Sequence, residues 1–133
     1  MEQLTRDMIL TATDLPTETI EVPEWGGAVQ VRGMTGTERD AYEAQFAQAK
    51  TSSDPAAMAN FRARTCVRCI VSEDGTRLFS DRDADALGAK SAQALHRVFG
   101  VAIRLSGLGK AAVEAAEKNS ASDQSADSGS SSP

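Results

Sequence analysis

The segment Asp54-Pro55-Ala56-Ala57-Met58-Ala59-Asn60-Phe61-Arg62-Ala63-Arg64-Thr65-Cys66-Val67-Arg68-Cys69-Ile70-Val71-Ser72-Glu73 carries the pattern from which we predict the fold. Asp54 is a favourable N-cap, and Pro55 suits the first helical position because its missing N–H needs no partner there. The segment is rich in alanine and meets no helix breaker before Gly75. At about 100° per residue, small and apolar side chains cover most of the circumference, namely Phe61, Thr65, Met58, Cys69, Cys66, Ala59 and Ile70. A helix this apolar is normally covered on several sides, so we predict that residues 55–72 form the central helix of a small, mainly α domain.

Two alternating runs before this segment predict a β-hairpin over about residues 20–33. The first run extends from Ile20 to Trp25 and the second from Ala28 to Gly33, with Gly26-Gly27 between them. Alternating apolar and polar side chains on either side of a glycine pair are typical of a hairpin. Pro23 lacks the N–H that a strand ladder needs, so the first strand is expected to be bulged or to lie at the edge of the sheet.

Three further helices are predicted around the central one. Thr35 and Glu38 match a capping box, in which each side chain bonds to the backbone of the other residue, so a helix is expected over about residues 36–50. A serine followed by acids favours a second helix over about residues 81–89. The last helix is expected over about residues 91–106, with an apolar face formed by Leu95, Val98, Phe99, Ala102 and Leu105.

The two ends of the chain differ from its body. Thr5 is expected to cap a short helical turn near the N-terminus. Residues 119–133 consist almost entirely of Ser, Ala, Asp, Gly, Gln and Pro, and they include no large apolar side chain. Such a segment cannot offset the entropy lost on ordering, so we predict a disordered tail after one helical domain of residues 1–118.

Composition and charge narrow the class of protein. The net charge of −5 over 133 residues favours solubility and argues against general nucleic-acid binding, which depends on a positive patch. No apolar run approaches the ~20 residues of a membrane span, and the N-terminus lacks the layout of a signal peptide. Two close cysteines without a disulfide framework are typical of a cytosolic protein. We therefore expect a cytoplasmic protein with neither a membrane nor a nucleic-acid partner.

The residues that could carry chemistry do not form a recognisable reactive site. Cys66 and Cys69 have the spacing of a redox or zinc pair, but both fall mid-helix on the apolar side, and a zinc site needs two further ligands. The single histidine, His96, has no partner nucleophile. The aspartates within residues 81–85 alternate as in a calcium loop, but the glycine and the closing glutamate of such a loop are missing. We expect core cysteines, no metal or cofactor, and no catalytic site.

Two residues have both a structural and a functional interpretation. Arg62 lies on the apolar side of the predicted central helix. Either its stem covers apolar surface while its head stays in water, or it forms an ion pair with Glu38, Glu43 or Asp85. Trp25, the only tryptophan, either folds back onto a helix or anchors a partner, as exposed tryptophans often do. The sequence leaves both alternatives open.

Several short motifs, taken together and in order, resemble a known family. The first are Val22-Pro23-Glu24-Trp25-Gly26-Gly27 and Val29-x-Val31-Arg32-Gly33-Met34-Thr35-Gly36-x-Glu38-Arg39. Later come Cys69-Ile70-Val71-x-Glu73-Asp74-Gly75-x-Arg77-Leu78-Phe79 and the Ala94-Leu95 helix that ends in Leu105-Ser106-Gly107-Leu108. Over about residues 5–109, the chain resembles the tail assembly chaperones of long-tailed bacteriophages and related prophages.

The resemblance implies a small, largely helical, non-catalytic protein of the host cytoplasm that is absent from the mature virion. It implies two partners: the tape-measure protein, which family members keep soluble, and the tail-tube protein, whose polymerisation they help. Self-association stays open. Many members are made in two lengths through a programmed ribosomal frameshift. This chain is expected to be the short form, with Glu117-Lys118-Asn119 or Gly109-Lys110 as the candidate slippery site.

A chaperone of this kind needs a groove or face that accepts an amphipathic helix of the tape-measure protein. Candidate contacts are aromatic, adaptable or cationic side chains on the hairpin and the outer sides of the helices, namely Trp25, Met34, Tyr42, Phe46, Arg62 and Phe99. The alternative function is that of a structural tail-completion, head–tail connector or adaptor protein that is retained in the virion.

Overall fold

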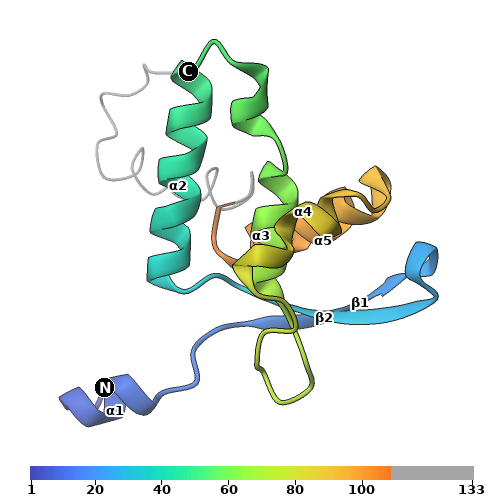
Figure 1. The fold of residues 1–133 in the computed structure, drawn as a ribbon. Helices are drawn as coiled ribbons and strands as arrows, with labels where there is room; N and C mark the ends of the chain where they lie inside the picture. Colours follow the sequence, from blue (N-terminus) through green and yellow to red (C-terminus); the bar gives the residue numbers. More distant parts are fainter. Residues whose placement is uncertain (109–133) are drawn as a thin grey trace, which may run out of the picture.

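The computed structural model describes residues 1–108, which form a largely helical body with a small sheet (Figure 1). The helices are α1 (Arg6–Thr11), α2 (Gly36–Thr51), α3 (Phe61–Cys69), α4 (Ala84–Gly88) and α5 (Ala92–Leu105). The strands are β1 (Thr17–Val22), β2 (Gly27–Arg32) and β3 (Ile70–Val71). Short 3-10 turns occur at Pro23–Trp25, Pro55–Met58 and Asp81–Asp83. The largely helical fold class is therefore confirmed in outline, whereas the predicted tail at 119–133 lies outside the described residues.

The predicted hairpin is present and is part of a three-stranded antiparallel sheet with the order β1-β2-β3. The pairing of β1 with β2 runs from Thr17 opposite Arg32 to Val22 opposite Gly27. The turn is longer than a glycine pair, because Pro23–Trp25 forms a 3-10 turn that ends at Gly26, whose φ is +78°. Pro23 therefore stands just outside the ladder, and β1 is the edge strand that its sequence predicted.

The prediction of one helix over residues 55–72 is wrong at both ends. The first residues form a separate 3-10 turn, and Asn60 then takes a left-handed conformation with φ of 58°. Its side chain donates to Asp85 Oδ1 at 2.7 Å, so a tertiary contact with α4 holds the break. At the other end, Ile70 and Val71 pair with β2 as a third strand. Both are β-branched, and packing on a sheet outweighs the weak helical preference of such residues.

The shortened helix α3 nevertheless occupies the centre of the molecule. Six of its residues are buried, namely Phe61, Ala63, Thr65, Cys66, Val67 and Cys69. It packs against α5 and α4, and α5 also packs against both strands of the hairpin. The fully buried core side chains around it include Val22, Val31, Ile70 and Val98. The central position predicted for this segment is therefore correct, although its length is not.

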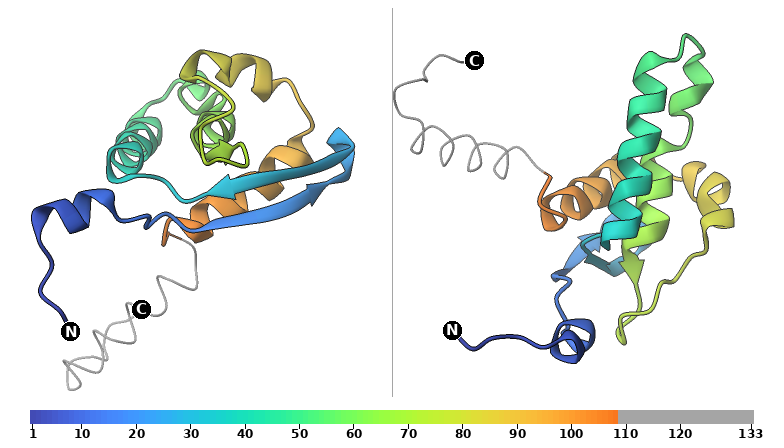
Figure 2. Two further views of the ribbon diagram at one scale, coloured as in Figure 1. Left: turned by 90° about the horizontal axis from the view of Figure 1, so that it is seen from below. Right: turned by 90° about the vertical axis from the view of Figure 1, so that its left-hand side faces the viewer.

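The other elements follow their sequence signals closely. The capping box at the start of α2 is formed, with Thr35 Oγ1 accepting from the Glu38 N–H and Glu38 Oε1 accepting from the Thr35 N–H. The predicted 81–89 segment is a 3-10 turn followed by α4, and the predicted 91–106 helix is α5. Thr5 caps α1, which buries none of its residues and stands away from the body in both views of Figure 2.

The junction between the sheet and α5 is unusually close. A Cβ on Gly33 would lie 2.7 Å from the Leu105 carbonyl oxygen, so only glycine fits there without a shift of the backbone. The neighbouring Met34 N–H donates to Ser106 Oγ at 2.8 Å, and Ser106 Oγ donates in turn to the Ala102 carbonyl at 2.7 Å. The segment that links β2 to α2 is thus fixed to the end of α5.

Candidate partner-binding surface

Four aromatic rings from three helices form a continuous set of contacts, which we call the aromatic cluster: Tyr42 and Phe46 of α2, Phe61 of α3, and Phe99 of α5. The Phe61 ring lies 5.3 Å from Tyr42, 5.8 Å from Phe46 and 6.0 Å from Phe99, measured between ring centroids. Tyr42 and Phe46 stack at 6.3 Å, which places their rings on the same side of α2. Contacts of this kind are favourable at centroid distances of about 4.5–7 Å.

The aromatic cluster has a buried centre and an exposed edge. Phe61 is 5% exposed, whereas Phe46 is 40% exposed and the neighbouring residue Met58 is 43% exposed. Burial, together with the charge of Glu43, raises the pKa of the Tyr42 hydroxyl, so this group stays protonated and can donate a hydrogen bond. The cluster therefore presents exposed apolar side chains next to a buried ring, Phe61, that packs between rings from α2 and α5.

Two cations lie over the rings of this cluster. The Lys50 ammonium lies 5.5 Å from the centroid of Phe46, and the Arg62 guanidinium carbon lies 5.6 Å from that of Phe99. Within residues 1–108, neither cation forms an ion pair with a carboxylate. Cations held over ring faces are attracted by the ring quadrupole and remain available to an anionic group of a partner.

The hairpin contributes to a second, separate surface, which we call the hairpin groove. It is an open groove of about 780 Å³ lined by Glu24, Trp25, Val29, Ile70, Leu78, Phe79, Asp83, Ala86, Leu87 and Lys90. Trp25 is half-buried and packs against the core, whereas Leu78 at the rim is 55% exposed. The Trp25 indole N–H is buried and has no acceptor among the described residues.

The structure groups some of the candidate contact residues and separates others. Tyr42, Phe46, Arg62 and Phe99 come together in and around the aromatic cluster. Trp25 packs against the core and lines a different groove. Met34 is only 7% exposed and lies beside the close junction with α5, so in this structure it offers little surface to a partner.

The sequence did not identify Phe61 as a candidate, although its ring joins the other three. The helical spacing had placed it on the buried side of the central helix, which is correct. What the sequence lacked was the crossing of α2 and α5 over that side. The ion pair considered for Arg62 is not formed, because Glu38 pairs with Arg32, Glu43 pairs with Arg39, and Asp85 accepts from Asn60.

Ion pairs fix two of the helices that carry the aromatic cluster, α2 and α5. Arg32 on β2 binds both carboxylate oxygens of Glu38, at 2.8 and 3.1 Å, and so holds the start of α2 to the sheet. Burial alone would raise the pKa of Glu38, but the hydrogen bonds from Arg32 and Thr35 hold it below its usual value. On α5, Arg97 binds Glu24 at 2.7 Å and Arg104 binds Glu18 at 2.8 Å. The hydrogen bonds from Arg97 lower the pKa of Glu24 to about 2.

The cysteines lie in the core, as their place on the helix predicted. Both are fully buried, and burial raises the pKa of each thiol to about 12, so the reactive thiolate form is suppressed at neutral pH. Cys66 Sγ contacts the Leu95 carbonyl oxygen at 3.7 Å.

Residues 1–108 contain no group of three or more His, Cys, Asp or Glu side chains arranged to hold a metal ion. Within the same residues, no helix is both long enough and apolar enough to cross a membrane.

One family model shows the family of this chain, and one solved structure shows a similar fold. The family model described as phage tail assembly chaperone matches residues 5–121. Among solved structures, the bacteriophage HK97 tail assembly chaperone has a similar fold, with a TM-score of 0.58 and 16% sequence identity, over 74% of this chain and 94% of that chain. No curated protein sequence matches. From the family match over most of its length, the chain belongs to the phage tail assembly chaperone family.

Proposed function

We propose that the protein is a non-catalytic chaperone that binds the tape-measure protein in the host cytoplasm and promotes assembly of the tail tube around it. The observation that carries this proposal is the partly exposed aromatic cluster, which is built on three helices, two of which, α2 and α5, are held to the hairpin by ion pairs. Apolar surface of this kind accepts the apolar face of an amphipathic helix. A tape-measure protein exposes such faces until the tube encloses it.

The size of the aromatic cluster suits a temporary complex. Covering an exposed Phe or Met side chain contributes about 1.5–3 kcal/mol at most, and only part of Phe46 and Met58 is left to cover. Two partly covered side chains contribute less than the about −8 kcal/mol of a micromolar Kd, so the exposed edge of the cluster alone does not support nanomolar binding, which corresponds to about −12 kcal/mol. Weak complexes of this kind dissociate quickly, which allows tube subunits to replace the chaperone.

Co-expression tests the proposal with a matched pair of variants. The tape-measure protein encoded with this chain is produced alone, with the wild type, with Phe46→Ser, and with the control Leu78→Ser, which removes a somewhat more exposed apolar side chain from the hairpin groove. We expect the wild type and the Leu78 variant to keep the tape-measure protein in the soluble fraction, and the Phe46 variant to lose most of this effect. A tape-measure protein that stays equally insoluble with and without the wild-type chain would refute the function.

The alternative function, a structural tail component retained in the virion, is favoured by one feature. Leu4, Ile9 and Leu10 in and before α1 are more than half exposed and do not pack on the body, as expected of an arm that makes lasting contacts in an assembly. The same arm is a candidate for self-association, which light scattering of the purified protein measures. Mass spectrometry of purified virions separates the two functions, since only a retained component gives a stoichiometric signal.

We also propose that the chain is the short product of a frameshifted pair of reading frames. The support is the family membership, together with Gly109-Lys110 and Glu117-Lys118-Asn119, whose codons can include a run of adenines. The coding DNA decides this point directly, because a slippery run of adenines and an overlapping downstream frame must both be present.

A further inference from the structure

We infer that the helix accepted by the aromatic cluster is acidic, with carboxylates beside its apolar stripe that pair with Lys50 and Arg62. This inference rests on the proposed function, because it names the chemistry of the partner that the same surface binds. The argument depends on which cations of this chain are already paired, and on where the unpaired cations lie.

Most arginines on the body have a carboxylate partner. Six ion pairs occur within residues 1–108, and all six cations are arginines, at positions 6, 32, 39, 77, 97 and 104. The whole chain has a net charge of −5, so acids outnumber bases. An unpaired cation on such a chain is not explained by a shortage of carboxylates. What distinguishes Lys50 and Arg62 from the other unpaired cations is that each lies over an aromatic ring.

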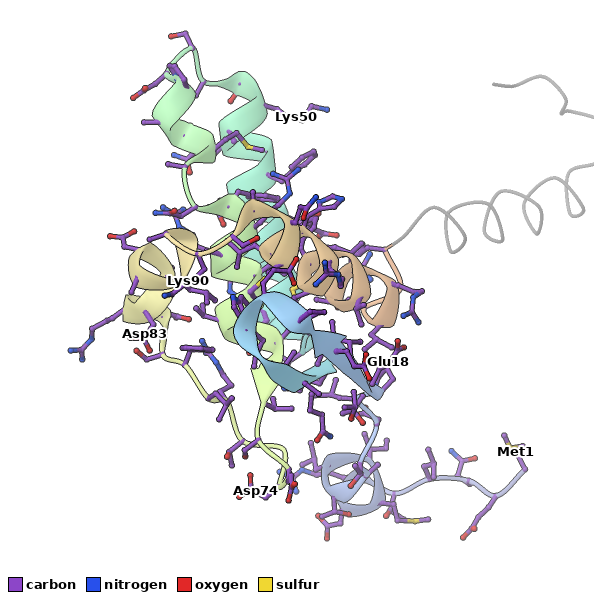
Figure 3. The ribbon with its side chains drawn as sticks, turned by 90° about the vertical axis from the view of Figure 1, so that its right-hand side faces the viewer. Met1, Glu18, Lys50, Asp74, Asp83 and Lys90 are labelled. Carbon is purple, nitrogen blue, oxygen red and sulfur yellow. The ribbon has the colours of Figure 1, made fainter. Side chains whose placement is uncertain are left out.

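Two of the unpaired cations, Lys50 and Arg62, lie over rings of the aromatic cluster itself. Arg62 also borders an adjoining pocket of about 330 Å³, which it shares with Phe61, Met58, Lys90 and His96. Figure 3 places Lys50 near the outer end of α2 and Lys90 between α4 and α5. Apolar surface with positive charge on more than one side complements an apolar stripe flanked by negative charge.

Two acids that were candidate partners for Arg62 are already engaged. Glu43, on the same helix as Tyr42, pairs with Arg39 at 3.1 Å. Asp85 accepts from Asn60 at 2.7 Å and does not line the pocket that Arg62 borders. Within the part of the chain that the structure describes, Arg64, Arg68 and Arg82 also lack a carboxylate partner, but none of them belongs to the cluster or to that pocket. They supply control positions on the same body.

The test uses three fluorescein-labelled amphipathic peptides of equal length and an identical apolar stripe of leucines. The first carries glutamates beside the stripe, the second glutamines at those positions, and the third lysines. Binding to the full-length protein is measured by fluorescence anisotropy at low and at high salt. Two exposed ion pairs at the sites of Lys50 and Arg62 are expected to make the acidic peptide bind about tenfold tighter than the glutamine peptide at low salt, and high salt should shrink this ratio.

Paired variants assign the effect to the surface. In the double variant Lys50→Gln/Arg62→Gln, the acidic peptide should lose its advantage, while the glutamine peptide binds within about twofold of its wild-type affinity. The control double variant Arg64→Gln/Arg82→Gln should keep the advantage. Circular dichroism melting curves of both variants report whether the fold is intact.

Four outcomes overturn the inference, and they differ in what they leave standing. Equal binding of the acidic and glutamine peptides removes the acidic partner but leaves the proposed chaperone function untouched. Preference for the lysine peptide removes it in the same way. A shift of the Trp25 fluorescence on binding of the acidic peptide, with no effect of the Lys50→Gln/Arg62→Gln variant, places the helix in the hairpin groove instead. Failure of every peptide to bind also overturns the inference, and the co-expression assay then judges the function separately.

Discussion

Replacing Glu38 by glutamine, which breaks its ion pair with Arg32, should destabilise the protein more than breaking any other ion pair described above. The Glu38 side chain is 16% exposed and that of its partner Arg32 is 10% exposed, so the pair is largely withdrawn from water. Glutamine keeps an oxygen that can accept from the Thr35 N–H, which preserves the helix cap. The loss is therefore mainly that of the charge opposite Arg32. The guanidinium would keep the Gly33 carbonyl at 2.9 Å and the retained side-chain oxygen as acceptors, but it would lose the second carboxylate oxygen, which now accepts from Arg32 Nη2 at 3.1 Å.

The expected loss follows from the geometry of the pair. Removing one partner of a buried ion pair costs about 3–5 kcal/mol, and the remaining exposure of this pair lowers the expected value to about 2–3 kcal/mol. The matched control is Glu43→Gln, which removes a half-exposed partner of Arg39 and should cost about 0.5 kcal/mol or less. Urea unfolding at pH 7, followed by circular dichroism, measures both free energies of unfolding.

The pH dependence gives an independent check on the same pair. The pKa of Glu38 is lower in the folded protein than its ordinary value of 4.5. Its contribution to stability is therefore fully present well above pH 4.5 and is lost as the pH falls through the lowered pKa of the folded state, because the unfolded state binds the proton first. The difference in unfolding free energy between wild type and Glu38→Gln should shrink progressively as the pH is lowered below 4.5. A difference that stays constant across this range, or a Glu38 loss no larger than that of Glu43, would refute the reasoning.

Three further predictions concern the core and the break before α3. Leu95→Ala, which removes a buried α5 side chain, should cost about 2–5 kcal/mol in urea unfolding. Asn60→Ala should be about 1–2 kcal/mol less stable than Asn60→Gly in the same assay. Both variants lose the hydrogen bond to Asp85, but only alanine is strained at a φ of 58°. Equal stabilities of the two variants would contradict a left-handed backbone at this position. Cys66 and Cys69, with pKa values of about 12, should not react with Ellman's reagent at pH 8 until the protein is unfolded. Rapid reaction of the native protein would show that one thiol is accessible.

Local signals carried most of the correct predictions from sequence. Thr35 and Glu38 lie within one helical turn, so their capping box needs no tertiary information. The alternation that ends at Val22 and resumes at Ala28 is equally local, and the hairpin follows from it. The order of such motifs along the chain led to the correct family.

The features that the sequence did not predict all depend on contacts between distant parts of the chain. Asn60 interrupts the central helix because Asp85 lies opposite it, 25 residues away. Ile70 and Val71 leave the helix because β2 offers an edge to pair with. Phe61 was placed correctly in the interior, but only the crossing of three helices makes it the hub of the aromatic cluster. Which partner this surface meets stays a prediction.

The close junction between Met34 and Ser106 has a consequence for the order of events during synthesis. These residues are 72 positions apart, and the hairpin needs α5 to cover Val22 and Val31. At about 5–20 residues per second, translation takes about 4–14 seconds to cover that separation. During this interval, the newly made hairpin has an uncovered apolar side, and the edge of β2 stays free until Ile70 and Val71 are made. The chain is therefore vulnerable to aggregation on the ribosome until α5 emerges.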